Sequence, residues 1–133
     1  MTVRIPAARA AGVLLAALII AGCGPKSVAL SVEMTDFKFI PEDLEAPARA
    51  DVSLTLTNVA SVEHSWILFE AGYQATLPVD ADDTEHIYWE GKVPAGETQT
   101  FTFVAPAESG VYQVICGVAG HAEAGMLGIF TVP

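Results

Sequence analysis

The sequence lacks the features that would let this chain bind nucleic acid or span a membrane with an ordinary helix. Its 133 residues include only six Lys and Arg against sixteen Asp and Glu, a formal charge of −10. So few basic residues offer phosphates little to bind, and we expect no nucleic-acid partner. The longest uncharged apolar run, residues 10–20, is well short of the roughly 20 residues that a membrane-spanning helix needs.

The apolar run at residues 10–20 has the form of a secretory signal peptide. Arg4 and Arg9 precede it, and it leads into "IAGC" at residues 20–23. Small residues before a cysteine resemble the lipobox of bacterial lipoproteins; an uncleaved membrane anchor is the alternative. The resemblance predicts a signal peptide over residues 1–22 and a lipidated Cys23 with a short tether over 23–27. The protein would then be exported and lipid-anchored to a bacterial membrane, facing the periplasm or the extracellular side.

Cysteine usage then leaves one free thiol in the exported part of the chain. If Cys23 carries lipid, Cys116 has no partner for an internal disulfide. A thiol in an oxidising compartment is a liability unless it has a function. Without Arg4 and Arg9, four basic residues oppose sixteen acidic ones, a charge of −12 that favours a partner with a basic face. Solubility alone is the competing explanation of this charge.

Residues 28–133 read as a single all-β domain. Seven segments alternate apolar and polar residues or are rich in β-branched and aromatic residues, and turns with Pro and Gly separate them. Residues 70–85 are the least strand-like and suggest a long excursion with a helical turn. We therefore predict a Greek-key β-sandwich of about seven or eight strands. The predicted strands are residues 28–34, 51–59, 62–69, 86–93, 98–104, 110–116 and 126–132.

The segment "CGVAGHAEAGM", residues 116–126, places a cysteine, a histidine and a methionine five residues apart. Six of the eight residues between these three are glycine or alanine, so the loop can fold back tightly. Cys116 ends a strand on its inward face, and His121 and Met126 can converge on its sulfur. Three donors from one loop make an incomplete metal site, which needs a fourth ligand from a neighbouring strand.

Two histidines are candidates for that fourth ligand. His64 shares the predicted inward face of segment 62–69 with apolar residues. His86 follows a run of acids and reads as a solvated surface residue. Two imidazoles, a thiolate and a weak thioether are the ligand set of blue-copper sites, whereas a thioether disfavours calcium, magnesium and ordinary zinc sites. The donors therefore predict one copper ion in the domain.

These residues lie in a sequence that resembles the cupredoxins, and among them the auracyanins, over essentially all of residues 28–133. "FKFIPEDL" (37–44) resembles the early Phe-x-Phe-x-Pro segment of the family, and residues 54–69 resemble its first-ligand region. The spacing Cys-x4-His-x4-Met is that of the auracyanins. By position, the resemblance implies the copper ligands His64, Cys116, His121 and Met126.

The resemblance implies a type 1 blue-copper protein that shuttles one electron between redox partners and is not an enzyme. Cytochromes or membrane-bound respiratory or photosynthetic complexes are the expected class of partner. An apolar shell would exclude water from the metal and raise its potential, with contributions from Phe37, Phe39, Trp66 and Phe130. A copper storage or delivery protein with the same ligands is the alternative. Met-rich tracts would favour it, but the exported part of this chain has only Met34 and Met126, which argues against it.

Two positions depart from the family pattern. Many cupredoxins have Asn directly after the first His ligand, where it ties the two ligand segments together; this chain has Ser65. The ligand loop often has Pro before its Gly-His pair, where this chain has Ala119. Both changes could loosen the ligand loop, and the sequence leaves their effect on the reduction potential open.

Overall fold

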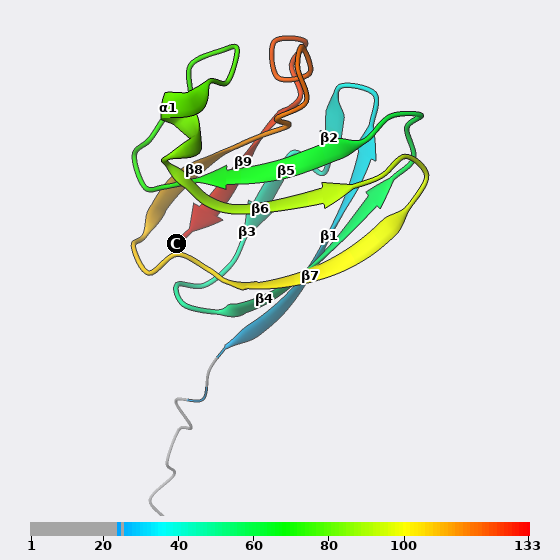
Figure 1. Cartoon of the computed structure of the whole chain (residues 1–133). Coiled ribbons are helices and arrows are strands. Elements are labelled where there is room, and N and C mark those ends of the chain that lie inside the picture. Colours follow the sequence, from blue (N-terminus) through cyan, green and yellow to red (C-terminus); the bar gives the residue numbers. More distant parts are fainter. Residues whose placement is uncertain (1–23, 25) are drawn as a thin grey trace, which may run out of the picture.

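In the computed structural model, which describes residue 24 and residues 26–133, the chain folds into two packed β-sheets (Figure 1). The signal peptide and the lipidation site predicted over residues 1–23 lie outside the described residues. The described part contains nine strands and one short helix, which are β1 (Ser27–Thr35), β2 (Lys38–Ile40), β3 (Asp43–Glu45), β4 (Asp51–Asn58), β5 (His64–Phe69), α1 (Ala81–Thr84), β6 (Ile87–Val93), β7 (Thr98–Val104), β8 (Gly110–Ile115) and β9 (Leu127–Val132).

The strand order confirms the predicted sandwich. One sheet has the order β2-β1-β4-β7 and the other the order β3-β9-β8-β5-β6. Neighbours are antiparallel except for β1 with β4 and β3 with β9, which are parallel because the chain crosses between the sheets. Two strands, β2 and β3, were not predicted. Each has three residues, too few to show a period, and each forms only by pairing with β1 or β9.

The core lies between the two sheets. The alternation predicted for β4 is confirmed, because Val52, Leu54 and Leu56 are buried and share one face. Aromatic rings fill the centre, where the ring of Trp66 lies 6.0–6.3 Å from three other aromatic rings, those of Trp89, Phe103 and Phe130. Such packing holds β5, which begins with His64, in a fixed position.

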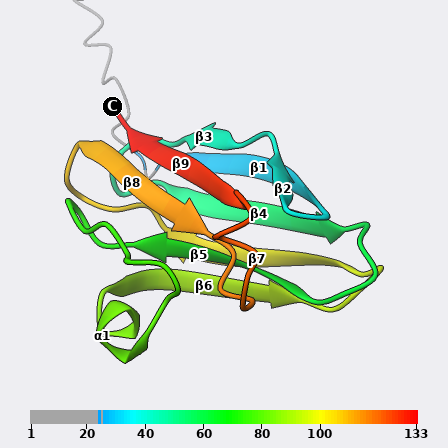
Figure 2. The same cartoon turned by 90° about the horizontal axis from the view of Figure 1, so that it is seen from above.

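Strand β5 is buried on both faces. All six of its residues are buried, although the sequence predicted only one inward face. The second face is covered by residues 70–86 between β5 and β6, which contain the predicted excursion, and Figure 2 shows α1 beside β5 and β6. Ile67, Phe69 and Ile115 form a second apolar cluster there with Ala122 of the loop between β8 and β9.

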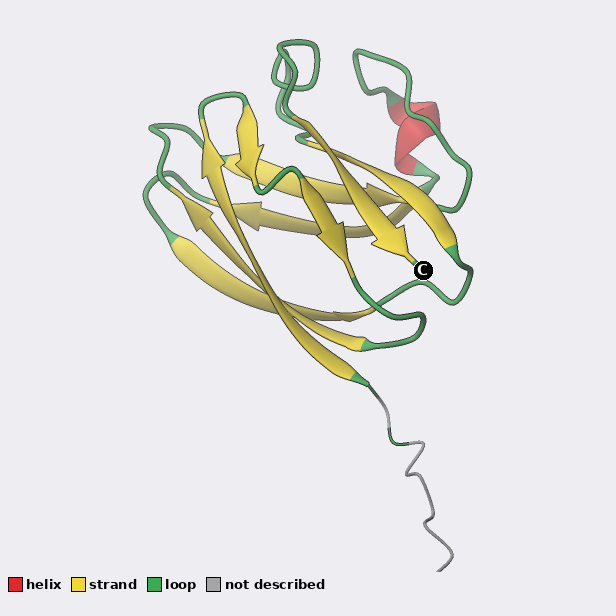
Figure 3. Ribbon diagram, turned by 180° about the vertical axis from the view of Figure 1, so that it is seen from behind, coloured by secondary structure: helices red, strands yellow, loops and turns green. Residues whose placement is uncertain are grey.

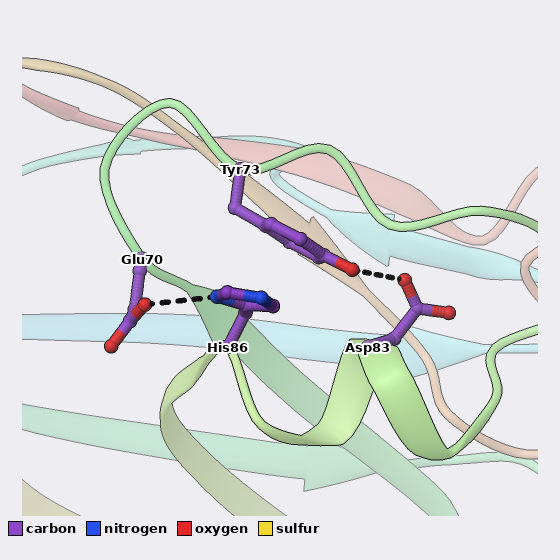
Figure 4. Close-up of polar contacts among 4 residues, drawn as sticks. All are labelled: Glu70, Tyr73, Asp83 and His86. Atoms are coloured by element: carbon purple, nitrogen blue, oxygen red, sulfur yellow. Dashed lines mark hydrogen bonds and ion pairs between the residues drawn. The ribbon is translucent and has the colours of Figure 1, made fainter.

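Asp83 holds the excursion together. Its buried carboxylate accepts hydrogen bonds from the Tyr73 hydroxyl (2.7 Å), the Thr76 N–H (3.0 Å) and the Asp80 N–H (2.9 Å). The bond from Asp80, followed by that from Tyr73, lowers the pKa of Asp83, and the same carboxylate raises the pKa of Tyr73 to about 12 (Figure 4). The predicted helical turn is confirmed as α1.

The loop between β8 and β9 stands at one end of the sandwich, near the turn between β1 and β2, whereas β1 begins at the opposite end (Figures 1 and 3). Helix α1 lies near the same end of the sandwich as this loop. Among the described residues, no helix has the length and apolar character to cross a membrane.

Candidate metal centre

The four predicted ligands come from two segments at the loop end of the sandwich. His64 is the first residue of β5, Cys116 directly follows β8, and Met126 directly precedes β9. The loop between them is closed by main-chain hydrogen bonds. The Cys116 N–H donates to the Met126 carbonyl (3.1 Å), and the Met126 N–H donates to the His121 carbonyl (2.9 Å). Gly120 and Gly125 have φ of 84° and 101°, which the tight turns require.

Three donor atoms form a small triangle. The Cys116 Sγ lies 3.6 Å from the Nδ1 of His64 and 3.6 Å from the Nδ1 of His121, and the two Nδ1 atoms are 3.1 Å apart. A point equidistant from these atoms lies about 2.0 Å from each of them. Bonds from a metal ion to imidazole nitrogen and thiolate sulfur are about 2.0–2.3 Å long, so the triangle has the size of a metal site. The structure thus brings these three predicted ligands together.

The environment of His64 favours metal binding. Its side chain is fully buried, and burial, together with the nearby His121, lowers the pKa of His64 against an opposing effect of Asp36. The neutral ring keeps the lone pair that a metal requires. Its Nε2 is buried without a hydrogen-bond partner among the described residues. The Nδ1 atom of His64 faces the Nδ1 of His121 and the Sγ of Cys116. A cation between these three atoms would give each of them a partner.

Met126 is placed beside the triangle by its main chain. The residue is fully buried, and its N–H and carbonyl are bonded to His121 and Cys116. A thioether in this position is a weak, soft donor, which suits the fourth ligand of a copper site. The sequence therefore located all four residues at one end of the fold.

Ser65 ties the two ligand segments together through a hydrogen bond, although its side chain is shorter than that of asparagine. Its buried hydroxyl accepts a hydrogen bond of 2.8 Å from the N–H of Gly117, 52 residues away. Gly117 permits this approach, because a Cβ there would lie 2.5 Å from the Ile67 side chain. The short serine side chain thus makes the connection for which the longer asparagine was expected.

The loop around Ala119 is also held closed without a proline. The Ala124 N–H donates to the Gly120 carbonyl (3.1 Å), and the Gly125 N–H donates to the Ala122 carbonyl (2.9 Å). Ala122 is buried against the second apolar cluster. Main-chain bonds and this anchor hold the loop in place without the proline.

His86 lies outside the triangle, as predicted. Its ring stacks on Tyr73 at a centroid distance of 4.0 Å, and its Nδ1 lies 3.2 Å from a carboxylate oxygen of Glu70 (Figure 4). The ring belongs to the excursion and is partly exposed. Its partners explain its position without a metal.

Three of the four residues that were predicted to form the apolar shell are buried. Phe39, Trp66 and Phe130 are buried in the core, but the side chain of Phe37 is 47% exposed. Phe37 lies in the turn between β1 and β2, where no alternation constrains it.

Asn58 is a structural residue whose role the sequence did not indicate. Its buried amide donates to the carbonyls of Val62 (2.8 Å) and Val93 (2.9 Å), and its Oδ1 accepts from the Ala60 N–H (3.0 Å). Val93 pairs with His64 across β5 and β6. Asn58 therefore supports the start of β5 from two sides. One feature of the sequence could have indicated this role: Asn58 is a polar residue at the end of the otherwise apolar inward face of residues 52–58.

A β-sandwich that presents two imidazole nitrogens and a cysteine sulfur in a buried triangle, with a methionine beside them, is the architecture of a type 1 copper protein. The family of copper binding proteins described as plastocyanin/azurin matches residues 26–133. The chain therefore belongs to the plastocyanin/azurin family of copper-binding proteins, and its cofactor is copper.

The auracyanins are among its relatives, as the ligand spacing predicted. Auracyanin-B of Chloroflexus aurantiacus is 31% identical over 110 residues, which cover 71% of this chain and 46% of that protein. The chain thus spans about half the length of this relative. The structure of auracyanin B is similar with a TM-score of 0.65 and 28% identity, covering 85% of this chain and 93% of that one. Auracyanin A, a "blue" copper protein of Chloroflexus aurantiacus, gives 0.66 and 27%, covering 80% and 99%.

Proposed function

We propose that this protein is an electron carrier, which accepts and releases one electron at a time between redox proteins at a bacterial membrane. The buried triangle of His64, Cys116 and His121 carries this proposal, because two tied segments hold its atoms at metal-binding distances. Bound copper supplies the change between Cu(I) and Cu(II). A scaffold that fixes one ligand geometry for both states reduces the rearrangement that accompanies each electron.

Each ligand has a distinct role in this proposal. The Cys116 thiolate would provide the strong bond to copper, the His64 and His121 imidazoles would complete the set of strong ligands, and the Met126 thioether would adjust the reduction potential as a weak donor. Buried apolar neighbours exclude water and favour the less charged Cu(I) state. Cys116 is only 1% exposed, which closes its sulfur to a substrate, so we assign no enzymatic role to it.

The site has an exit toward a partner. His121 is partly exposed, unlike the buried His64, so electrons would leave through its ring. A groove beside the ligand loop is lined by Glu63, Asp80 and Glu90 with a single lysine, Lys92. These charges favour a partner with a basic docking face, such as a cytochrome or a respiratory or photosynthetic complex.

Membrane attachment is part of the proposal. A lipid on Cys23 would lie only a few residues before β1, and β1 begins at the end of the sandwich opposite the ligand loop (Figure 1). The copper end would then face away from the lipid anchor, on the periplasmic or extracellular side. A tether of about four residues spans less than about 20 Å, which restricts encounters to partners at the same membrane.

A visible spectrum tests the copper centre. Cu(II) added to the protein without residues 1–23 should give an intense blue band from sulfur-to-copper charge transfer, and Cys116→Ser should abolish it. His86→Ala is the matched control, since His86 lies outside the triangle, and it should keep the band. A band that persists without Cys116 would disprove the site.

Copper retention separates an electron carrier from a copper storage or delivery protein, the alternative with the same ligands. A carrier should keep Cu(I) in the presence of a moderate chelator and exchange electrons rapidly with a basic cytochrome c at low salt. Exchange should slow at high salt, because screening weakens the attraction between opposite charges. Ready loss of Cu(I) to an apo copper enzyme, with slow electron exchange, would favour delivery.

A further inference from the structure

Phe37 occupies a backbone conformation that its side chain disfavours. Thr35 pairs with Lys38, so Asp36 and Phe37 form the two-residue turn between β1 and β2. The φ angle of Phe37 is 62°, in the left-handed region where a bulky residue is an outlier. Turns with a positive φ at this position ordinarily use Gly or Asn. The turn therefore carries a phenylalanine against its own local preference.

Burial in the core does not explain the phenylalanine. Its side chain is 47% exposed, whereas Phe39, two residues later, is 1% exposed. The ring of Phe37 instead stands edge-on to the imidazole of His121, with centroids 5.1 Å apart and an interplanar angle of 77°. This is a favourable T-shaped aromatic pair. The strained turn thus directs a half-exposed aromatic ring at one of the ligands.

His121 is the ligand that needs such a contact. His64 is fully buried at the start of a strand, so its neighbours fix its ring. His121 lies in a loop of small residues and is partly exposed. The hydrogen bonds from its N–H to the Val118 carbonyl and from the Met126 N–H to its carbonyl fix the main chain only. Among the described residues outside the triangle, Phe37 is the only aromatic residue that packs on the His121 ring.

We propose that Phe37 is a positioning residue for His121, retained despite the strain of its turn because its ring limits rotation of the imidazole. The inference rests on the proposed copper centre. Strained residues at functional sites persist where the surrounding structure determines them. The proposal predicts that a substitution of Phe37 that relieves the strain of the turn will also disturb the geometry of the copper ligands.

Three variants of the protein without residues 1–23 test the proposal. Phe37→Asn relieves the turn but removes the ring, Phe37→Tyr keeps the ring, and Arg49→Asn is the matched control. Within residues 26–133, Arg49 is the other non-glycine residue with a positive φ, 58°, and it is exposed. The measurements are the Tm of the apo-protein, the NMR resonances of the His121 ring, the EPR hyperfine splitting of the Cu(II) protein and the rate of Cu(I) loss to a chelator.

Phe37→Asn should leave the apo-protein Tm unchanged or raise it by a few degrees, as should Arg49→Asn. Phe37→Asn alone should shift the His121 resonances, change the hyperfine splitting and accelerate Cu(I) loss about tenfold, the usual size of an effect on a supporting residue. Phe37→Tyr should retain the wild-type copper properties.

Two results would overturn the proposal. A fall of more than about 5 °C in the apo-protein Tm of Phe37→Asn would identify an ordinary packing residue. Copper properties of Phe37→Asn equal to those of Arg49→Asn would show that the ring does not position His121. If the wild-type protein forms no blue band, the proposed function fails instead, and the Tm and NMR measurements on the apo-protein still report on the contact.

Discussion

Replacing Ser65 with alanine removes the side-chain connection between the two ligand segments. The Ser65 hydroxyl accepts the N–H of Gly117 at 2.8 Å, and Gly117 directly follows Cys116. A buried N–H that loses its partner costs about 1–3 kcal/mol. Gly117 is exposed, so water can replace part of the lost bond, and we expect a cost at the lower end of this range, about 1 kcal/mol. For a domain of this size the Tm should fall by about 4–6 °C.

The same change should alter the copper site. Without the bond to Ser65, Gly117 can shift relative to β5, and the Cys116 sulfur shifts with it relative to the His64 nitrogen. We expect a changed charge-transfer band and a changed reduction potential in Ser65→Ala. Thr55→Val is the matched control, because the Thr55 hydroxyl makes a bond of similar length, 2.9 Å, to Thr100 on an exposed sheet face.

Thermal unfolding of the apo-protein, visible spectroscopy and voltammetry measure these effects. Thr55→Val should change the Tm by less than about 2 °C, as exposed hydrogen bonds contribute little, and should leave the spectrum unchanged. Equal Tm and equal potential for Ser65→Ala and Thr55→Val would refute the reasoning that Ser65 replaces the expected asparagine.

Three further predictions concern the ligands and the excursion. Met126→Gln should keep copper bound but lower the reduction potential, because a thioether favours Cu(I) over Cu(II); an unchanged potential in voltammetry would place Met126 away from the metal. In copper titrations, His64→Ala should lose tight binding whereas His86→Ala should not, and equal losses would refute the assignment. Asp83→Asn should destabilise the protein at pH 7. Because the folded-state pKa of Asp83 is lowered, the stabilisation is present above the unfolded pKa of about 3.9 and disappears as the pH falls through the folded value. The Tm difference from wild type should therefore shrink below about pH 4, and the pKa of Tyr73, about 12 in the wild type, should fall toward its usual value in an absorbance titration. A Tm difference that is constant with pH would contradict this account.

Local features of the sequence predicted most strands and the composition of the site. Alternation identified β4 and placed Val52, Leu54 and Leu56 in the core, because side chains on a strand point to opposite faces in turn. The spacing of Cys116, His121 and Met126 was informative for a similar reason. All three lie within eleven residues, so the chain itself limits how far apart they can be.

Other features had no local signal. Strands β2 and β3 have three residues each and exist only because β1 and β9 provide hydrogen-bonding partners. The burial of both faces of β5 depends on the excursion, whose position Asp83 fixes through bonds to residues up to ten positions away. The exposure of Phe37 follows from the conformation of its turn. A phenylalanine in the sequence does not predict such a turn, because turns with a positive φ ordinarily use Gly or Asn.

The sequence by itself determined which donor atoms are present, which strand face carries His64 and which metal those donors prefer, since these are properties of residue types and of short-range alternation. Only the tertiary structure decided that the Nδ1 of His64 lies 3.1 Å from that of His121, 57 residues away, and that Ser65 bonds Gly117 across 52 residues. These distances depend on how two sheets pack and on the register of β5 with its neighbours, which many weak contacts set together.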